Sequence, residues 1–173
     1  LQPNRKEEES RVKAEEEALD RIKKRDDINA IQYLSKGRLL VKNVEHHYFI
    51  FPYIEGNDIS EYTTKDKRFS EAEALKFLNE MTITVLKLAE EGIIHQDIKP
   101  ANIKHTSKGE FILLDLGIAR FIDHDYKISK QQGPAKYLSP EQIELGQKKS
   151  QSNQRLITFV SDLYSLAVVT IEV

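Results

Sequence analysis

His95-Gln96-Asp97-Ile98-Lys99-Pro100-Ala101-Asn102 is the stretch that decides the fold, and Asp115-Leu116-Gly117 follows it eighteen residues after Asp97. Each stretch comes directly after a short apolar run, which predicts a loop or turn at the end of a strand. Phosphoryl transfer needs a carboxylate near the attacking hydroxyl, oxygen ligands for Mg²⁺, and a cation near the transferred group. The side chains that supply this set are Asp97, Lys99, Asn102 and Asp115.

Upstream of these motifs the chain changes character twice. Residues 4–27 are mostly charged with sparse apolar positions, which predicts an exposed helix with one narrow docking stripe. Residues 28–54 are β-like, and Ser35-Lys36-Gly37 predicts a turn between the first two strands. The expected strands span residues 31–34, 39–44 and 48–54. Gly56-Asn57-Asp58 is expected to end the regular structure after them.

Downstream, a long helix is predicted over 71–91. Ser70 and Glu73 form a capping box at its start, and Gly92 is placed to end it. A β-hairpin is expected at 103–114 across the turn 106–109, and a fully buried helix over 161–173. The buried stripe of the long helix is expected to comprise Leu78, Met81, Val85 and Leu88.

Taken together, the motifs resemble those of the eukaryotic-like (Hanks-type) serine/threonine protein kinases over residues 12–173. The first stretch matches the catalytic loop H-R-D-x-x-x-x-N, with Gln96 in place of arginine. The second matches D-F-G, with Leu116 in place of phenylalanine. Further matches are Ser139-Pro140-Glu141 to A-P-E, Asp162 to the aspartate opening the central helix of the large lobe, and Phe51 to Gly56 to the hinge.

The resemblance implies an α+β, two-lobed kinase fold. Residues 1–51 would form part of the small lobe (its helix αC and strands), 52–57 the hinge, and 58–173 part of the mainly helical large lobe, truncated in its central helix. The chain starts at Leu1 and stops at Val173 inside an apolar run, so we expect a truncated catalytic domain. We expect the Gly-rich loop and the small-lobe lysine to be missing, and the fragment to be inactive alone.

The resemblance also implies roles for the residues of the two motifs, with ATP and Mg²⁺ as cofactors. Asp97 would accept the proton of the substrate hydroxyl, and Lys99 would contact the γ-phosphoryl group. Asn102 and Asp115 would ligate Mg²⁺. Glu15 would pair with the upstream lysine; its alternative is one more solvated charge in a run of glutamates.

A nucleotide site is implied by the hinge and the strand after Asn102. Asp58 would reach the ribose; the alternative is that it caps a short helix. In the family, the position of Lys104 usually carries an aliphatic side chain that packs beneath the adenine. The methylene stem of Lys104 would form this apolar surface instead. The hinge residues facing adenine would be Phe51, Pro52, Tyr53 and Ile54.

Departures from the family pattern keep other functions open. Gln96, Leu116 and Pro134 favour, as an alternative, a pseudokinase that binds nucleotide or acts as a scaffold. A third hypothesis is a kinase-like phosphotransferase acting on a small metabolite. Because Gln96 cannot clamp a phosphorylated loop as arginine would, we expect activity without phosphorylation of Tyr126 or Ser129.

Composition limits the kinds of partner that we expect. The net charge is −2, so the chain has no excess of basic residues that would indicate nucleic-acid binding. No apolar run is long enough to cross a bilayer. The chain has no cysteine, which excludes disulfides and thiolate metal sites and suits a cytoplasmic location. The expected partners are ATP and a protein substrate, with a second polypeptide that supplies the upstream strands as one alternative.

Overall fold

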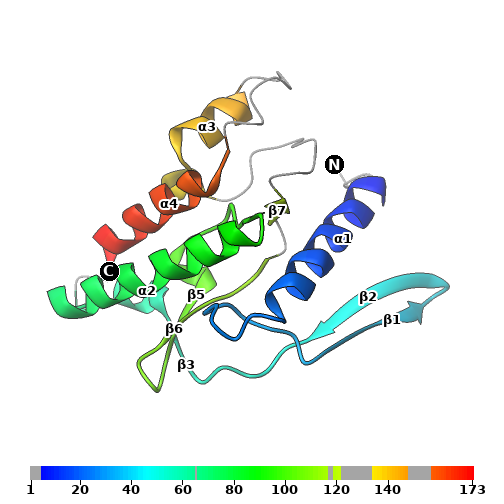
Figure 1. The fold of residues 1–173 in the computed structure, drawn as a ribbon, viewed down its shortest axis with the longest axis horizontal. Helices are drawn as coiled ribbons and strands as arrows, with labels where there is room; N and C mark the ends of the chain where they lie inside the picture. The colour runs from blue at the N-terminus through cyan, green and yellow to red at the C-terminus, as the bar shows by residue number, and fades with distance from the viewer. Residues whose placement is uncertain (1–4, 65, 117–118, 122–133, 148–156) are drawn as a thin grey trace.

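The structure is a computed structural model that describes residues 5–64, 66–116, 119–121, 134–147 and 157–173 (Figure 1). The helices of this part of the chain are α1 (Arg5–Ile22), α2 (Glu71–Glu90), α3 (Pro140–Gln147) and α4 (Phe159–Glu172), with the 3-10 helices η1 (Ile59–Tyr62), η2 (Pro100–Asn102) and η3 (Ala135–Tyr137). Its strands are β1 (Ser35–Val41), β2 (Val44–Ile50), β3 (Gly56–Asp58), β4 (Ile93–Ile94), β5 (Ile103–Thr106), β6 (Phe111–Leu113) and β7 (Arg120–Phe121). This mixture confirms the α+β expectation.

Helix α1 lies between the β1–β2 hairpin and helix α2 (Figure 1). It buries one stripe of small and branched apolar side chains, as the spacing predicted. The chain after α1 then runs beside β6, where Ile31 N–H donates to Leu113 O at 2.8 Å and Leu113 N–H to Asn29 O at 2.9 Å. The buried stripe of α1 comprises Ala14, Ala18, Leu19 and Ile22.

The turn prediction for this hairpin was wrong. Residues 35–37 lie inside β1, and residues 31–34 form no strand. The chain reverses instead at Lys42 and Asn43, which both have positive φ (49° and 63°). Two such residues allow the tight two-residue turn that matches strand twist, and Asn tolerates that conformation well. Lys42 and Asn43 are a polar pair between Val41 and Val44, so the sequence did carry a signal for this turn.

A second correction concerns residues 56–58, which form strand β3 rather than the end of a region of regular structure. Asp58 pairs with Lys104 and Gly56 with Thr106 in the antiparallel sheet β3-β5-β6. Gly56 has φ 141°, and a Cβ there would lie 2.2 Å from His105 O. Only glycine therefore allows this strand to approach β5.

Helix α2 and the following hairpin β5–β6 confirm the sequence predictions. Ser70 and Glu73 form both halves of the capping box: Glu73 N–H donates to Ser70 Oγ, and Ser70 N–H donates to Glu73 Oε2 at 2.8 Å. Met81, Val85 and Leu88 are buried, whereas Leu78 is only partly buried. Near the turn of the hairpin, aromatic side chains from β5 and β6 pack against others from α2 and the residues before it. The cluster comprises Tyr62, Phe69, Phe77, His105 and Phe111.

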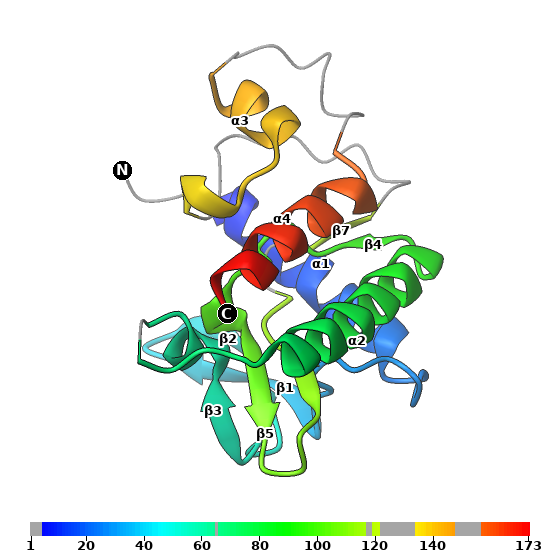
Figure 2. The ribbon, with the colours of Figure 1, turned by 90° about the vertical axis from the view of Figure 1, so that its left-hand side faces the viewer.

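Helix α4 packs along α2, and the two lie side by side in both views (Figures 1 and 2). The prediction of a fully buried helix was wrong, because only one face is covered. That face carries Asp162, Leu166 and Val169, while Ile171 is 82% exposed. In the part of the chain that the structure describes, no helix combines the length and apolarity needed to span a bilayer.

The capping box gives a test of the fold. We expect Ser70→Ala to lower the free energy of unfolding by about 1 kcal/mol at pH 7, because the backbone N–H of Glu73 at the start of α2 loses its acceptor, the Ser70 hydroxyl. Urea titration followed by circular dichroism measures this change. Ser60→Ala, on the exposed 3-10 helix η1, is the matched control and should leave the unfolding free energy unchanged.

The same box adds a pH dependence to this first prediction. Hydrogen bonds from the Ser70 hydroxyl and then its backbone lower the pKa of Glu73 from its ordinary value of 4.5. The stabilisation is present above that value and is lost as the pH falls through the lowered pKa. Glu73→Gln should therefore destabilise the chain at pH 7 but cost much less at pH 3; an equal cost at both pH values would contradict the assignment.

Candidate active site

The loop that carries Asp97 is anchored by a buried carboxylate on another element. Asp162, in the first turn of α4, is 1% exposed and accepts His95 N–H at 2.7 Å and Gln96 N–H at 2.8 Å. Gln96 adopts a left-handed conformation (φ 67°), which non-glycine residues rarely adopt. Burial raises the pKa of Asp162, against the opposing influence of His95 and the two backbone donors.

His95 connects this loop to the strand that leads to Asp115. Asp97 N–H donates to Nδ1 of His95 at 3.2 Å, so the opposite ring nitrogen carries the proton and donates to Leu114 O at 3.0 Å. Leu114 N–H in turn donates to Asn102 O at 2.8 Å. These bonds fix the end of β6 against η2, which confirms His95 as a packed structural residue.

Asp97 sits at the centre of a small polar cluster. Lys99 Nζ donates to Asp97 Oδ2 at 2.6 Å, and Asn102 Nδ2 donates to the same oxygen at 2.9 Å. Asn102 Nδ2 also donates to the backbone oxygen of Asp97 at 2.9 Å. The structure therefore brings together three of the four residues of the predicted phosphotransfer set, with the carboxylate oriented from two sides.

The fourth residue, Asp115, follows β6 and is exposed, with a left-handed backbone (φ 56°). Asn102 uses its amide nitrogen on Asp97, which leaves its side-chain oxygen available to a cation. Among the described residues, no three acidic or histidine side chains converge on one point. An amide oxygen plus one carboxylate fits Mg²⁺, which typically takes its remaining ligands from water and phosphate oxygens.

Glu15 on α1 is partly buried and interacts electrostatically with Asp115. Burial, and then the negative charge of Asp115, raise the pKa of Glu15. This partial burial argues against the alternative of a fully solvated surface charge.

The predicted nucleotide residues divide into two groups. Asp58 and Lys104 are cross-strand neighbours, and Lys104 Nζ lies 3.3 Å from Asp58 Oδ1. Asp58 precedes η1, but its side chain makes no capping hydrogen bond, which argues against the capping alternative. In the hinge, Phe51, Pro52 and Ile54 are partly buried and Tyr53 is 90% exposed.

Some functional positions escaped the sequence analysis. Gln142, at the start of α3, is buried; its Oε1 accepts Ser139 N–H at 2.9 Å and its Nε2 donates to Gln96 O at 3.4 Å. It thereby joins the Ser-Pro-Glu segment to the catalytic loop, a long-range contact that no local pattern announces. The predictions for Gly117, Tyr126 and Ser129 concern residues outside the described part of the chain.

Comparisons with known proteins agree with this geometry. The family model of the protein kinase domain matches residues 2–173. A probable serine/threonine-protein kinase of Streptomyces coelicolor is 34% identical over 75% of the chain and 18% of its own length. The serine/threonine-protein kinase PrkC of Bacillus subtilis is 30% identical over 73% of the chain and 18% of its own length. The chain therefore spans less than a fifth of these relatives.

The anchor at Asp162 gives a second prediction. Asp162→Asn keeps one acceptor oxygen but points an amide donor at the other backbone N–H group, and we expect it to cost about 2–3 kcal/mol of unfolding free energy. Urea titration measures this loss. Asp66→Asn, at an exposed turn, is the matched control; equal stability of the two variants would show that the buried carboxylate is not the anchor.

Proposed function

The chain belongs to the protein kinase domain family, and from that premise we propose that its protein is a serine/threonine kinase that transfers the γ-phosphoryl group of ATP to a protein hydroxyl. The observation that carries this proposal is the Asp97 carboxylate, oriented by Lys99 and Asn102 beside the strand that ends at Asp115. Such a set supplies a proton acceptor, a cation and oxygen ligands within one site.

Each residue of the set has a part in the proposed reaction. Asp97 orients the attacking hydroxyl and accepts its proton, and Lys99 offsets charge on the transferred group. Asn102 and Asp115 would hold Mg²⁺ by their side-chain oxygens, and a bound ion would supply positive charge to the phosphates. Lys99, two residues after the aspartate, favours serine or threonine over tyrosine as acceptor, by resemblance to the family.

The domain boundaries are part of this proposal. Residues 1–51 would belong to the small lobe, 52–57 to the hinge and 58–173 to the large lobe. Phe51, Pro52, Tyr53 and Ile54 would face adenine from the hinge, Lys104 would lie beneath it, and Asp58 would reach the ribose. Glu15 would pair with a lysine from the part of the small lobe that precedes this chain.

One observation favours a second candidate function, a pseudokinase that scaffolds or binds nucleotide weakly. The Asp58–Lys104 ion pair joins the two side chains assigned to the ribose and to the adenine floor. Nucleotide binding would have to loosen this ion pair, and this would make the binding free energy less favourable. An apolar side chain beneath the adenine would not carry that cost. The transfer experiment below separates the two candidates.

The third prediction tests the proposed reaction in the protein at its full length. Asp97→Asn should lower phosphoryl transfer from radiolabelled ATP by about a hundredfold or more, because an amide cannot accept the proton. Asp115→Asn should abolish Mg²⁺-dependent transfer while the unfolding free energy is retained, since the amide lacks the charge that offsets the metal.

The control for both variants is again Asp66→Asn, which should transfer phosphate like the parent. Unchanged turnover in Asp115→Asn would remove its metal role. ATP binding by the parent without any transfer to protein hydroxyls would favour the pseudokinase, and turnover of a small molecule instead would favour the metabolite phosphotransferase.

The fourth prediction concerns the floor of the nucleotide site. Lys104→Met should tighten ATP binding about three- to tenfold, because it removes the ion pair with Asp58 and offers adenine an apolar surface. Isothermal titration calorimetry with Mg²⁺ present measures this change. Lys108→Met, in the exposed turn of the same hairpin, should leave affinity unchanged; weaker binding in Lys104→Met would show that the ammonium itself contacts the nucleotide.

A further inference from the structure

Helix α1 approaches the strand that follows Asp115 through one of its arginines. The guanidinium carbon of Arg21 lies 4.2 Å from the centroid of the Phe121 ring. Glu15 lies six residues before Arg21 on the same helix, and Asp115 lies six residues before Phe121. The contact between Arg21 and Phe121 draws α1 toward β7.

Arg21 makes this contact as part of a three-way junction. Its Nη1 donates to Glu91 O at 2.7 Å, just beyond the end of α2, and its Nη2 donates to Glu17 Oε1 at 2.7 Å. A cation is favoured at the carboxyl end of a helix, where carbonyl groups lack intrahelical partners. The guanidinium of Arg21 therefore links α1 to the end of α2 and to β7. Its face stacks on the Phe121 ring, and its edge donates the hydrogen bonds.

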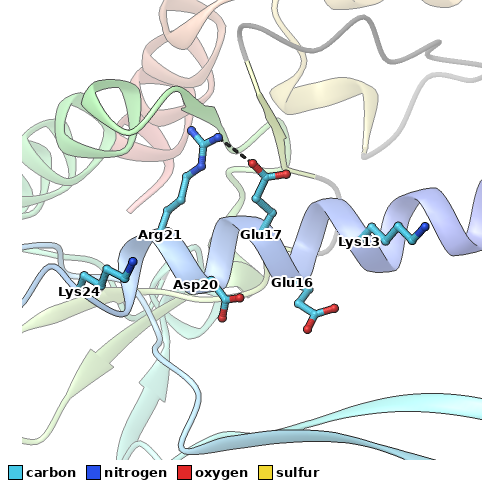
Figure 3. Close-up of a pocket in the computed structure, with 6 residues that line it drawn as sticks. All are labelled: Lys13, Glu16, Glu17, Asp20, Arg21 and Lys24. Carbon is cyan, nitrogen blue, oxygen red and sulfur yellow. Dashed lines mark hydrogen bonds and ion pairs between the residues drawn. The ribbon is translucent and has the colours of Figure 1, made fainter.

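Figure 3 shows on which side of α1 the Arg21 side chain lies. In Figure 3, Arg21 and Glu17 point from α1 toward the ribbons of α2 and the strand beside it, whereas Glu16 and Asp20 point to the opposite side, toward the hairpin. There Lys36 Nζ binds Glu16 at 2.8 Å and Asp20 at 2.6 Å. The residues that line the hollow of Figure 3 come from α1 and the turn directly after it, with no second element facing them: they are Lys13, Glu16, Glu17, Asp20, Arg21 and Lys24.

A second arginine strengthens the attachment without reaching β7. Arg25, about one turn after Arg21, contacts Asp27 at 2.9 Å, Glu90 at 3.0 Å and Glu91 at 2.5 Å. These are partly exposed ion pairs, each of small value and screened by salt. They hold the end of α1 on the end of α2.

We propose that Arg21 is a positioning residue that holds α1, and with it Glu15, against strand β7, which follows Asp115 along the chain. Phe121 is 3% exposed, and its strand β7 pairs with β4, so the ring is a fixed surface for the guanidinium to stack on. Along an α-helix, six residues span about 9 Å, so a clamp at Arg21 limits the swing of Glu15. The consequence for catalysis rests on the proposed kinase function; the positional claim does not.

The absence of cysteine from the chain allows a direct test of position. Cysteines introduced at Lys13, exposed on α1, and at Lys108, exposed in the β5–β6 turn, accept spin labels whose separation is measured by pulsed electron resonance. We expect one narrow distance distribution in the labelled parent and a broadened or shifted one in Arg21→Gln. Arg21→Lys, which keeps the cation but not the planar face, should lie between them.

Two controls make the result decisive. Arg38→Gln removes an exposed arginine that pairs with Glu45 at 3.3 Å on the hairpin, and should leave the distribution unchanged. Phe121→Leu should reproduce the broadening of Arg21→Gln, and the double variant should add little to it. A parent-like distribution in Arg21→Gln, or in Phe121→Leu, would overturn the proposal, the second by showing that Arg21 does not act through β7.

Kinetics supply a separate outcome. In the protein at its full length, Arg21→Gln should lower kcat for phosphoryl transfer by about tenfold or more, with KM for the protein acceptor unchanged and partial rescue in Arg21→Lys. An unchanged kcat beside a broadened distance distribution would overturn the catalytic consequence. If the parent transfers no phosphate, the proposed function fails, and the distance measurements still decide whether Arg21 positions α1.

Discussion

The buried carboxylate of Asp162 is the constraint on which the candidate site depends. A charge removed from water is costly unless hydrogen bonds replace its hydration, and here two backbone N–H groups of the catalytic loop do so. The same bonds hold Gln96 in its left-handed conformation, which sends the chain on toward Asp97. Helix α4 therefore stabilises a loop that has no regular secondary structure before η2.

Beside that anchor, helix α1 carries an electrostatic cost that other contacts offset. Burial, and then the charge of Asp115, raise the pKa of Glu15. Attractive contacts elsewhere on α1 compensate: Arg21 stacks on Phe121 on one side, and Glu16 binds Lys36 on the other.

Local signals in the sequence predicted local structure well. The capping box at Ser70 and the turn after Thr106 each satisfy their own backbone groups within a few residues, so α2 and the β5–β6 hairpin were foreseen. The turn at Lys42 and Asn43 was missed although this polar pair interrupts the apolar run, because Ser35-Lys36-Gly37, which contains a glycine, offered the stronger turn signal nearby. The pairing of Asp58 with Lys104 and the stacking of Arg21 on a distant ring depend on tertiary contacts, which no periodicity reveals.

The most direct test of the account is whether a nucleotide-bound metal lies between Asn102 and Asp115. Mn²⁺ replaces Mg²⁺ in such oxygen sites and broadens nuclear resonances near it. We predict that Mn²⁺ with ATP broadens the side-chain amide of Asn102 and the backbone amide of Asp115, while the amide of Asp66 stays sharp. Resonances of Asn102 and Asp115 that remain sharp under saturating Mn²⁺ and ATP would contradict the account.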